Sequence, residues 1–106
     1  LVAVATEVNI QTMLNREPEN SALKKYAVIG RRMTMNPHLQ PGDGLQMLIR
    51  LLATWTEEMR IPSLGKLGVN QSDFPRIIKN SRGSSMKTNP IYLEDAEIEK
   101  ILQSRL

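Results

Sequence analysis

The sequence predicts an all-α fold, a compact helical bundle of about five helices, and two observations lead to that prediction. Apolar residues recur at intervals of three and four along most of the 106-residue chain, which is the spacing of one face of an α-helix. Clusters of proline, glycine and asparagine separate these segments, and such clusters interrupt helices. Since a chain of this length can bury a single core, we expect one helical domain over residues 1–106.

The first predicted helix covers residues 1–16, where Ile10, Met13 and Leu14 follow helical spacing. Pro18 and its polar neighbours end it, because the residue before a proline avoids the helical conformation. The opening of the segment also suits a strand, because it is rich in β-branched residues. These are Val2, Val4, Thr6 and Val8.

Two longer helices are expected in the middle of the chain. Residues 22–35 form the first of them, with Ser21 as the N-cap, because a serine hydroxyl can accept a bond from an unpaired first-turn amide. Its apolar face should consist of Ala22, Leu23, Tyr26, Ala27, Ile29, Gly30 and Met33. Residues 36–44 are rich in turn-forming types and should form an exposed connection. The central helix should cover residues 45–59 and end before Pro62. Its apolar stripe consists of Leu45, Leu48, Ile49, Leu52, Trp55 and Met59.

The last third of the chain should contain a turn and two helices. Residues 64–69 combine two glycines with three apolar residues, so we expect a short turn held against the core. A helix is expected over residues 74–81, followed by a polar loop over residues 82–89. Glu94 and Asp95 then lie in the first turn of the last helix, at the positive end of its dipole. Its inward residues should be Ile98, Ile101, Leu102 and Leu106.

The aromatic residues and most methionines occupy core-like positions in this pattern. The aromatic residues are Tyr26, Trp55, Phe74 and Tyr92, and the inward methionines are Met13, Met33, Met47 and Met59. Met86 differs because it lies in the polar loop, with no helical face to join. A pocket or a partner contact is therefore as good an explanation for Met86 as ordinary packing.

Bulk composition narrows the class of protein. The chain is 41% hydrophobic and 24% charged, as in ordinary globular domains. No apolar run approaches the ~20 residues that span a bilayer, and the first residues lack the pattern of an export signal. There is no cysteine, which agrees with an expected cytoplasmic location.

The charged residues suggest little chemistry of their own. The net charge is +3, an excess that is compatible with weak nonspecific attraction to nucleic acid but not diagnostic of it. Nucleic acid is an unlikely partner because aromatic residues on which bases could stack are nearly absent between the basic ones. His38 has no second histidine at ligand spacing and is interpreted as an ordinary surface residue. Residues 42–44 lack the third glycine of a phosphate-binding loop, and adjacent helical carboxylates such as Glu57 and Glu58 point apart. We therefore expect no catalytic, cofactor-binding or metal-binding residue in this chain.

A series of short motifs nevertheless follows one another in a defined order. The series contains residues 9–16, Tyr26-Ala27-Val28-Ile29-Gly30, Ile61-Pro62, Leu67-Gly68-Val69, Phe74-Pro75 and Asn89-Pro90. In order, spacing and position it resembles the carboxy-terminal helical domain of the iron-containing alcohol dehydrogenases. In that family an α/β nucleotide-binding domain precedes the helical domain, and catalysis takes place in the cleft between them.

The resemblance implies a dehydroquinate synthase-like fold and a role as one wall of such a cleft. The parent enzyme would use NAD(P) and a divalent metal, iron or zinc, to interconvert a small alcohol and aldehyde. In the family the metal ligands, one aspartate and three histidines, lie upstream of the part that this chain covers. The fragment alone would be inactive, and its partner would be the N-terminal nucleotide-binding domain of the same parent chain.

The resemblance implies a role in substrate contact for one loop of this chain. The loop before Asn89-Pro90 approaches the substrate side of the cleft in relatives, and Ser85 and Met86 occupy the corresponding positions. Two departures from the family pattern limit which roles can be transferred to this chain. Relatives usually have serine or threonine where this chain has Glu94, and residues 36–44 match no family pattern, so His38 inherits no role.

The alternative is a stand-alone helical interaction module that binds an acidic partner or nucleic acid. Its candidate surface is the basic face of the second predicted helix, although a solvated outer face explains such residues more simply. These residues are Lys24, Lys25, Arg31 and Arg32. If the dehydrogenase interpretation holds, the isolated domain should instead expose an apolar surface and self-associate.

Overall fold

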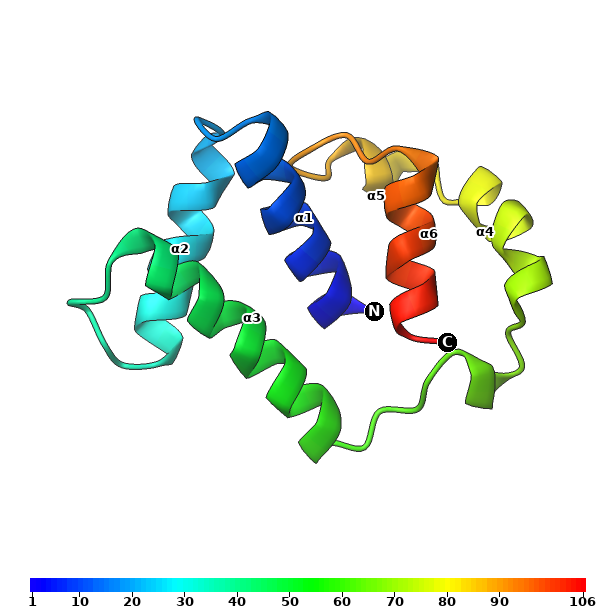
Figure 1. Ribbon diagram of the computed structural model, residues 1–106, viewed down its shortest axis with the longest axis horizontal. Helices are drawn as coiled ribbons and strands as arrows, with labels where there is room; N and C mark the ends of the chain where they lie inside the picture. The colour runs from blue at the N-terminus through cyan, green and yellow to red at the C-terminus, as the bar shows by residue number, and fades with distance from the viewer.

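The computed structural model describes residues 1–106 and contains only helices, turns and loops (Figure 1). The six α-helices are α1 (Val2–Arg16), α2 (Ser21–Met33), α3 (Pro41–Glu58), α4 (Phe74–Asn80), α5 (Ser84–Lys87) and α6 (Asp95–Ser104), and two short 3-10 helices are η1 (Gly65–Leu67) and η2 (Gln71–Asp73). The all-α prediction is confirmed. The strand alternative for the first residues is wrong, because α1 includes them.

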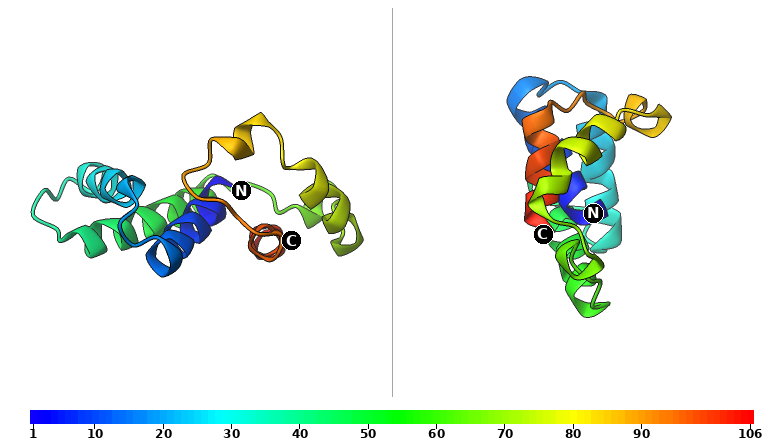
Figure 2. Two further views of the ribbon diagram at one scale, coloured as in Figure 1. Left: turned by 90° about the horizontal axis from the view of Figure 1, so that it is seen from above. Right: turned by 90° about the vertical axis from the view of Figure 1, so that its right-hand side faces the viewer.

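Helix α1 lies in the middle of the molecule and packs against helices on both sides. It contacts α2 and α3 on one side and α6 on the other, and α4 packs on α6 (Figures 1 and 2). The result is a flattened shape of 45 × 31 × 21 Å. The two chain ends lie close together, near the last turns of α3 and α6 (Figure 2).

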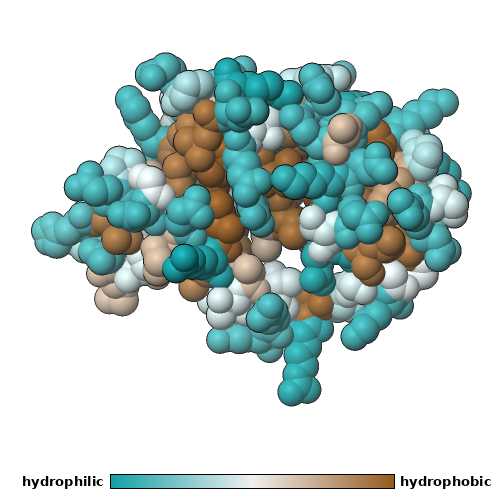
Figure 3. Space-filling view, in the orientation of Figure 1, coloured by the Kyte–Doolittle hydropathy of each residue, from teal (hydrophilic) through white to brown (hydrophobic).

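The core fills the spaces on both sides of α1. Its most deeply buried large side chains are Ile10 and Met13 of α1 and Phe74 at the start of α4. The remaining core residues are Val8, Leu23, Ala27, Leu45, Leu48, Ile78, Ile91, Leu93, Ile98, Ile101 and Leu102. Hydrophobic residues also reach the surface in the middle of one face, between hydrophilic ones (Figure 3).

Helices α2 and α3 approach each other at two glycines. A Cβ atom added to Gly30 would lie 1.9 Å from the carbonyl oxygen of Gly44, and one added to Gly44 would lie 2.8 Å from the oxygen of Ala27. Side chains at these positions would therefore clash with backbone, which cannot move as a flexible side chain can. The two glycines allow the helices to pack backbone against backbone.

One predicted helix start, one predicted cap and one predicted loop are wrong. Helix α3 begins at Pro41 rather than at residue 45, because a proline is well suited to the first turn of a helix. Asn20, not Ser21, caps α2, and its side chain accepts a bond from the amide of Ala22 at 2.9 Å. The predicted polar loop contains the single turn of α5, which raises the number of α-helices above the expected five.

Several predicted core residues are exposed instead. Tyr92 is 71% exposed and Met59 64%, whereas Phe74 is buried as predicted. The others are Ile29, Met33, Trp55, Leu67 and, at the chain end, Leu106. At the end of α3 the exposure follows from helix length. Helix α3 has 18 residues and α2 only 13, so the last turns of α3, with Trp55 and Met59, extend beyond the end of α2 and are not covered by it.

None of the six helices combines the length and the apolar character that crossing a bilayer requires.

Candidate functional site

Helix α5 carries the two residues predicted to line a substrate cleft. Gly83 precedes its first turn, and Thr88 ends it by donating a hydroxyl hydrogen bond to the carbonyl oxygen of Ser85 at 2.9 Å. The side chain of Ser85 is exposed, whereas Met86 is half-buried and packs against the hydrophobic core. The single turn thus directs Met86 inward and leaves Ser85 in solvent.

A pocket of about 230 Å³ lies beside α5. Its lining is mostly apolar with two basic side chains at its edge, from Arg82, Met86, Lys87, Tyr92 and Leu93. Met86 therefore lines a pocket, and Ser85 does not. This arrangement suits a small, largely apolar ligand, because apolar walls give affinity and a few polar groups give orientation.

Arg82 is the best-connected side chain of this pocket. Its guanidinium donates hydrogen bonds to the carbonyl oxygen of Leu93 and to Oδ1 of Asp95, and it lies 4.9 Å from the ring centroid of Tyr92. The hydrogen bond to Asp95 is the main reason that the pKa of Arg82 is raised; partial desolvation opposes it, and the nearby Tyr92 and Asp95 add to it. Arg82 is thus a fixed cation neutralised by a neighbouring carboxylate.

The wall behind the pocket, residues 89–94, is fixed by side chains from the first part of the chain. Asn9 and Asn89 exchange two amide hydrogen bonds, at 2.9 and 2.8 Å. Asn20 donates to the carbonyl oxygen of Pro90 at 3.0 Å, and Arg16 donates to that of Tyr92. Residues 89–94 have no helix of their own, so these bonds set their path.

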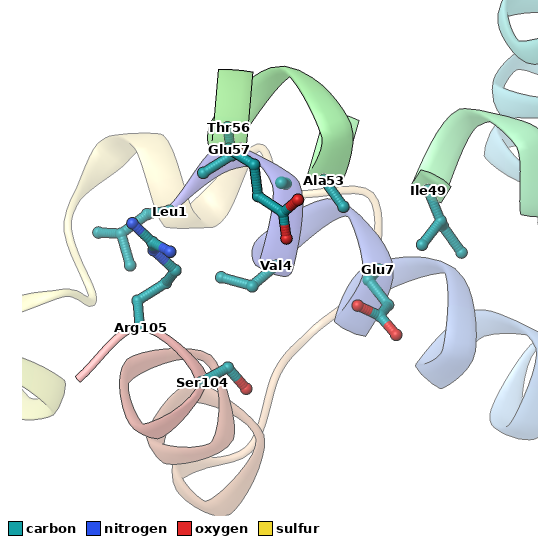
Figure 4. Close-up of a pocket in the computed structure, with 10 residues that line it drawn as sticks. Leu1, Val4, Glu7, Ile49, Ala53, Thr56, Glu57, Ser104 and Arg105 are labelled. Carbon is teal, nitrogen blue, oxygen red and sulfur yellow. The ribbon is translucent and has the colours of Figure 1, made fainter. Parts of the chain in front are cut away.

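A second, smaller cleft of about 130 Å³ opens where the ends of α1, α3 and α6 meet (Figure 4). Ten residues line it: Leu1, Ala3, Val4, Glu7, Ile49, Ala53, Thr56, Glu57, Ser104 and Arg105. Arg105 donates to the carbonyl oxygens of Ile61 and Pro62, at 2.9 and 3.1 Å. The cleft contains no histidine or cysteine, and its two carboxylates come from separate helices.

The chain has no group of three or more histidine, cysteine, aspartate or glutamate side chains that could hold a metal ion. His38 is exposed in the turn between α2 and α3, and its backbone amide donates to Oδ1 of Asn36 at 3.3 Å. Glu57 and Glu58 are both exposed. The residues of this chain therefore do not fit a metal site.

Sequence reasoning missed the two side chains that shape the α5 pocket. It assigned Tyr92 to the core and gave Arg82 no role, but the two stack on each other at the surface. Arg82 and Asp95 are 13 positions apart, a separation that no helical or turn spacing predicts. The only local signal was the isolated apolar residue Met86 within a polar segment.

Comparison with protein-family models, with curated proteins and with solved structures gives no match. These comparisons therefore assign neither a family nor an activity.

Proposed function

We propose that this chain is the C-terminal helical domain of a metal-dependent, NAD(P)-linked alcohol dehydrogenase or aldehyde reductase, with a dehydroquinate synthase-like fold. The observation that carries the proposal is the order of the motifs on a wholly helical chain, from Tyr26-Ala27-Val28-Ile29-Gly30 through Leu67-Gly68-Val69 to Asn89-Pro90. The parent enzyme would transfer a hydride between the nicotinamide and a small alcohol or aldehyde. Its proposed location is the cytoplasm.

In this proposal the chain supplies one wall of the active-site cleft. Its residues do not fit a metal ion, and in the family that it resembles the metal ligands and the dinucleotide loop lie upstream of this part, so both groups would be held by polypeptide outside this chain. The contribution of the helical domain would be to position the substrate and to exclude water from the reacting groups. The fragment alone is expected to be inactive.

The pocket beside α5 is the proposed contact with substrate. Met86 and Leu93 give it apolar surface, and the bonds of Asn9 and Arg16 to residues 89–94 support the pocket from behind. Asp95 neutralises Arg82, so the apolar walls favour a ligand with an uncharged, apolar body, and Lys87 adds one cation without an ion pair at the pocket. A small alcohol or aldehyde with an apolar body has that character. Ser85, exposed beside the pocket, would meet the substrate only in the closed cleft.

The uncovered end of α3 is the proposed contact with the nucleotide-binding domain. The apolar stripe that is buried at Leu45 and Leu48 continues to Trp55 and Met59, which are 39% and 64% exposed. Exposed apolar area of this kind marks an interaction surface in a folded domain. A second domain docked there would bury Trp55 and Met59, which α2 is too short to reach.

The reading frame upstream of Leu1 provides the test. The proposal predicts three histidines and one aspartate that can bind a metal and, further upstream, a glycine-rich dinucleotide loop that follows a strand. An independent start codon at or near Leu1, with neither feature upstream, would contradict it. The interaction module would then be the remaining interpretation.

A further inference from the structure

The outward side of α2 forms a surface on which basic and apolar residues alternate. We call it the α2 face and define it by Lys24, Lys25, Val28, Ile29 and Arg32. Residues four apart lie one above another on a helix, so Lys24, Val28 and Arg32 form one row and Lys25 and Ile29 form a second. The three basic residues are exposed, Ile29 is 42% exposed, and Val28 is half-buried.

The charges of this face have no acidic partner within the chain. Helix α2 contains no acidic residue, and the ion pairs of the structure involve only Arg16, Arg76 and Arg82 as cations. Arg31, at the edge of the face, donates instead to the carbonyl oxygen of Leu39 at 3.4 Å. A partner with carboxylates would therefore meet cations that need not leave an existing ion pair.

The apolar residues of the face lie at shallow hollows. One hollow is lined by Lys24, Lys25, Val28 and Ile29, and a second by Val28, Arg31, Arg32, Met35 and Pro37. Val28 belongs to both, so the hollows follow one another along the helix. Met35 is 89% exposed and has a φ of 56°, a conformation that a methionine adopts rarely.

We propose that the α2 face binds an acidic amphipathic helix of a partner protein. Glutamates of such a helix would pair with Lys25 and Arg32, and its apolar side chains would fill the hollows beside Val28 and Ile29. The opposite side of α2 is held against α3 by the contact of Gly30 with Gly44. The surface is therefore rigid before binding, which lowers the entropy cost of association.

Two other anionic ligands fit the face less well. The face has no aromatic residue on which nucleic-acid bases could stack, and apolar side chains between the cations contribute nothing to phosphate binding. It also lacks the tryptophan, phenylalanine or leucine that anchors a helix in a membrane surface. This inference does not depend on the proposed dehydrogenase function, because it concerns a different surface from the α5 pocket and the end of α3.

The test uses a labelled synthetic helical peptide that carries glutamate and leucine in alternating rows on one face, with binding followed by fluorescence anisotropy at low salt. We expect the chain to bind this peptide and to bind a scrambled peptide of equal composition about tenfold more weakly. Ile29→Ser and the double variant Lys25→Glu/Arg32→Glu should each weaken binding by about tenfold or more. The double variant Lys66→Glu/Lys79→Glu, an equal change of charge at two exposed positions outside α2, should leave it unchanged. Circular dichroism verifies that each variant is folded.

Four results would overturn the proposal. The first is no binding of the patterned peptide at low salt. The second is equal affinity for the scrambled peptide, or no effect of Ile29→Ser, since either would show a surface that recognises charge alone. The third is tighter binding of a single-stranded oligonucleotide that the double variant abolishes. The fourth is binding of phosphatidylserine vesicles that is tighter than binding of the patterned peptide and that the double variant also abolishes.

Discussion

The side-chain amides of Asn9 and Asn89 hydrogen-bond to each other in both directions, although 80 positions separate them in the chain. Asn9 is buried in α1, and Asn89 also donates to the carbonyl oxygen of Ile91 at 2.7 Å. The pair joins the first helix to the segment that forms the back of the α5 pocket. It ties the shape of the candidate site to the core of the fold.

Replacing Asn89 by alanine should destabilise the chain by about 1–3 kcal/mol, because the buried amide of Asn9 would lose its partner. Chemical denaturation measures the change. Asn15→Ala, an exposed position on the same helix as Asn9, is the control and should change stability by less than about 0.5 kcal/mol. In the double variant with Asn9→Ala, the loss should be smaller than the sum of the single losses. Strict additivity would show that the two amides are not coupled.

Two glycines should respond to alanine in opposite directions. Gly30→Ala should destabilise the chain by about 1–3 kcal/mol, because the clash with Gly44 outweighs the better helix propensity of alanine. Gly42 has no neighbour within 4 Å of the added atom, so Gly42→Ala should stabilise the chain by about 0.5 kcal/mol. Thermal unfolding measures both. A stable Gly30→Ala variant would mean that α2 and α3 are not in close contact.

Arg82→Gln should lower the melting temperature, because it removes the ion pair with Asp95 and the stacking on Tyr92. The folded-state pKa of Arg82 is raised above its ordinary value. The contribution of the charged Arg82 to folding stability is therefore complete below the unfolded-state pKa and is lost only when pH rises through the folded-state pKa. The difference in melting temperature from the wild type should therefore stay constant between about pH 6 and about pH 9. Arg76→Gln, which breaks an exposed pair with Asp73, should have a smaller effect. A difference in melting temperature that shrinks between about pH 6 and about pH 9 would contradict the raised pKa of Arg82.

The uncovered end of α3 should make the isolated chain self-associate. Analytical ultracentrifugation should detect dimers or larger species that become rarer in the double variant Trp55→Ser/Met59→Ser, because these exposed residues form the apolar surface. Met35→Ser removes an apolar side chain that is 89% exposed, more than Trp55 or Met59, in the turn between α2 and α3, and it should not reduce association. A wild-type chain that stays monomeric at all concentrations would contradict this prediction.

Much of the fold follows from local sequence signals. The periodicity around Ile10 and Met13 and the cap-and-proline pattern at Phe74 predicted helices that the structure contains. Features that depend on distant packing could not be predicted in the same way. Trp55 lies on the same stripe as Leu48, and only the shorter length of α2 leaves it exposed. The turn of α5 is too short to show helical periodicity.

The candidate site was predictable only in part. Met86 was notable in the sequence as an apolar residue among polar ones, and it lines a pocket. Ser85 was selected with it by resemblance and lies outside that pocket's lining, exposed to solvent. Its proposed contact with substrate remains a prediction. Arg82 and Tyr92 were missed because their stacking depends on the path of residues 89–94, which side chains of α1 and the following turn determine.

The proposed dehydrogenase function is tested by comparing NAD(P)-dependent alcohol oxidation by this chain alone and by the polypeptide that includes its upstream reading frame. Formation of NAD(P)H from small alcohols is measured after loading with Fe²⁺ or Zn²⁺. We expect no activity for residues 1–106 and metal-dependent activity for the longer polypeptide. Turnover by the isolated chain, or a longer polypeptide that is folded and metal-loaded yet inactive on every small alcohol and aldehyde, would contradict it.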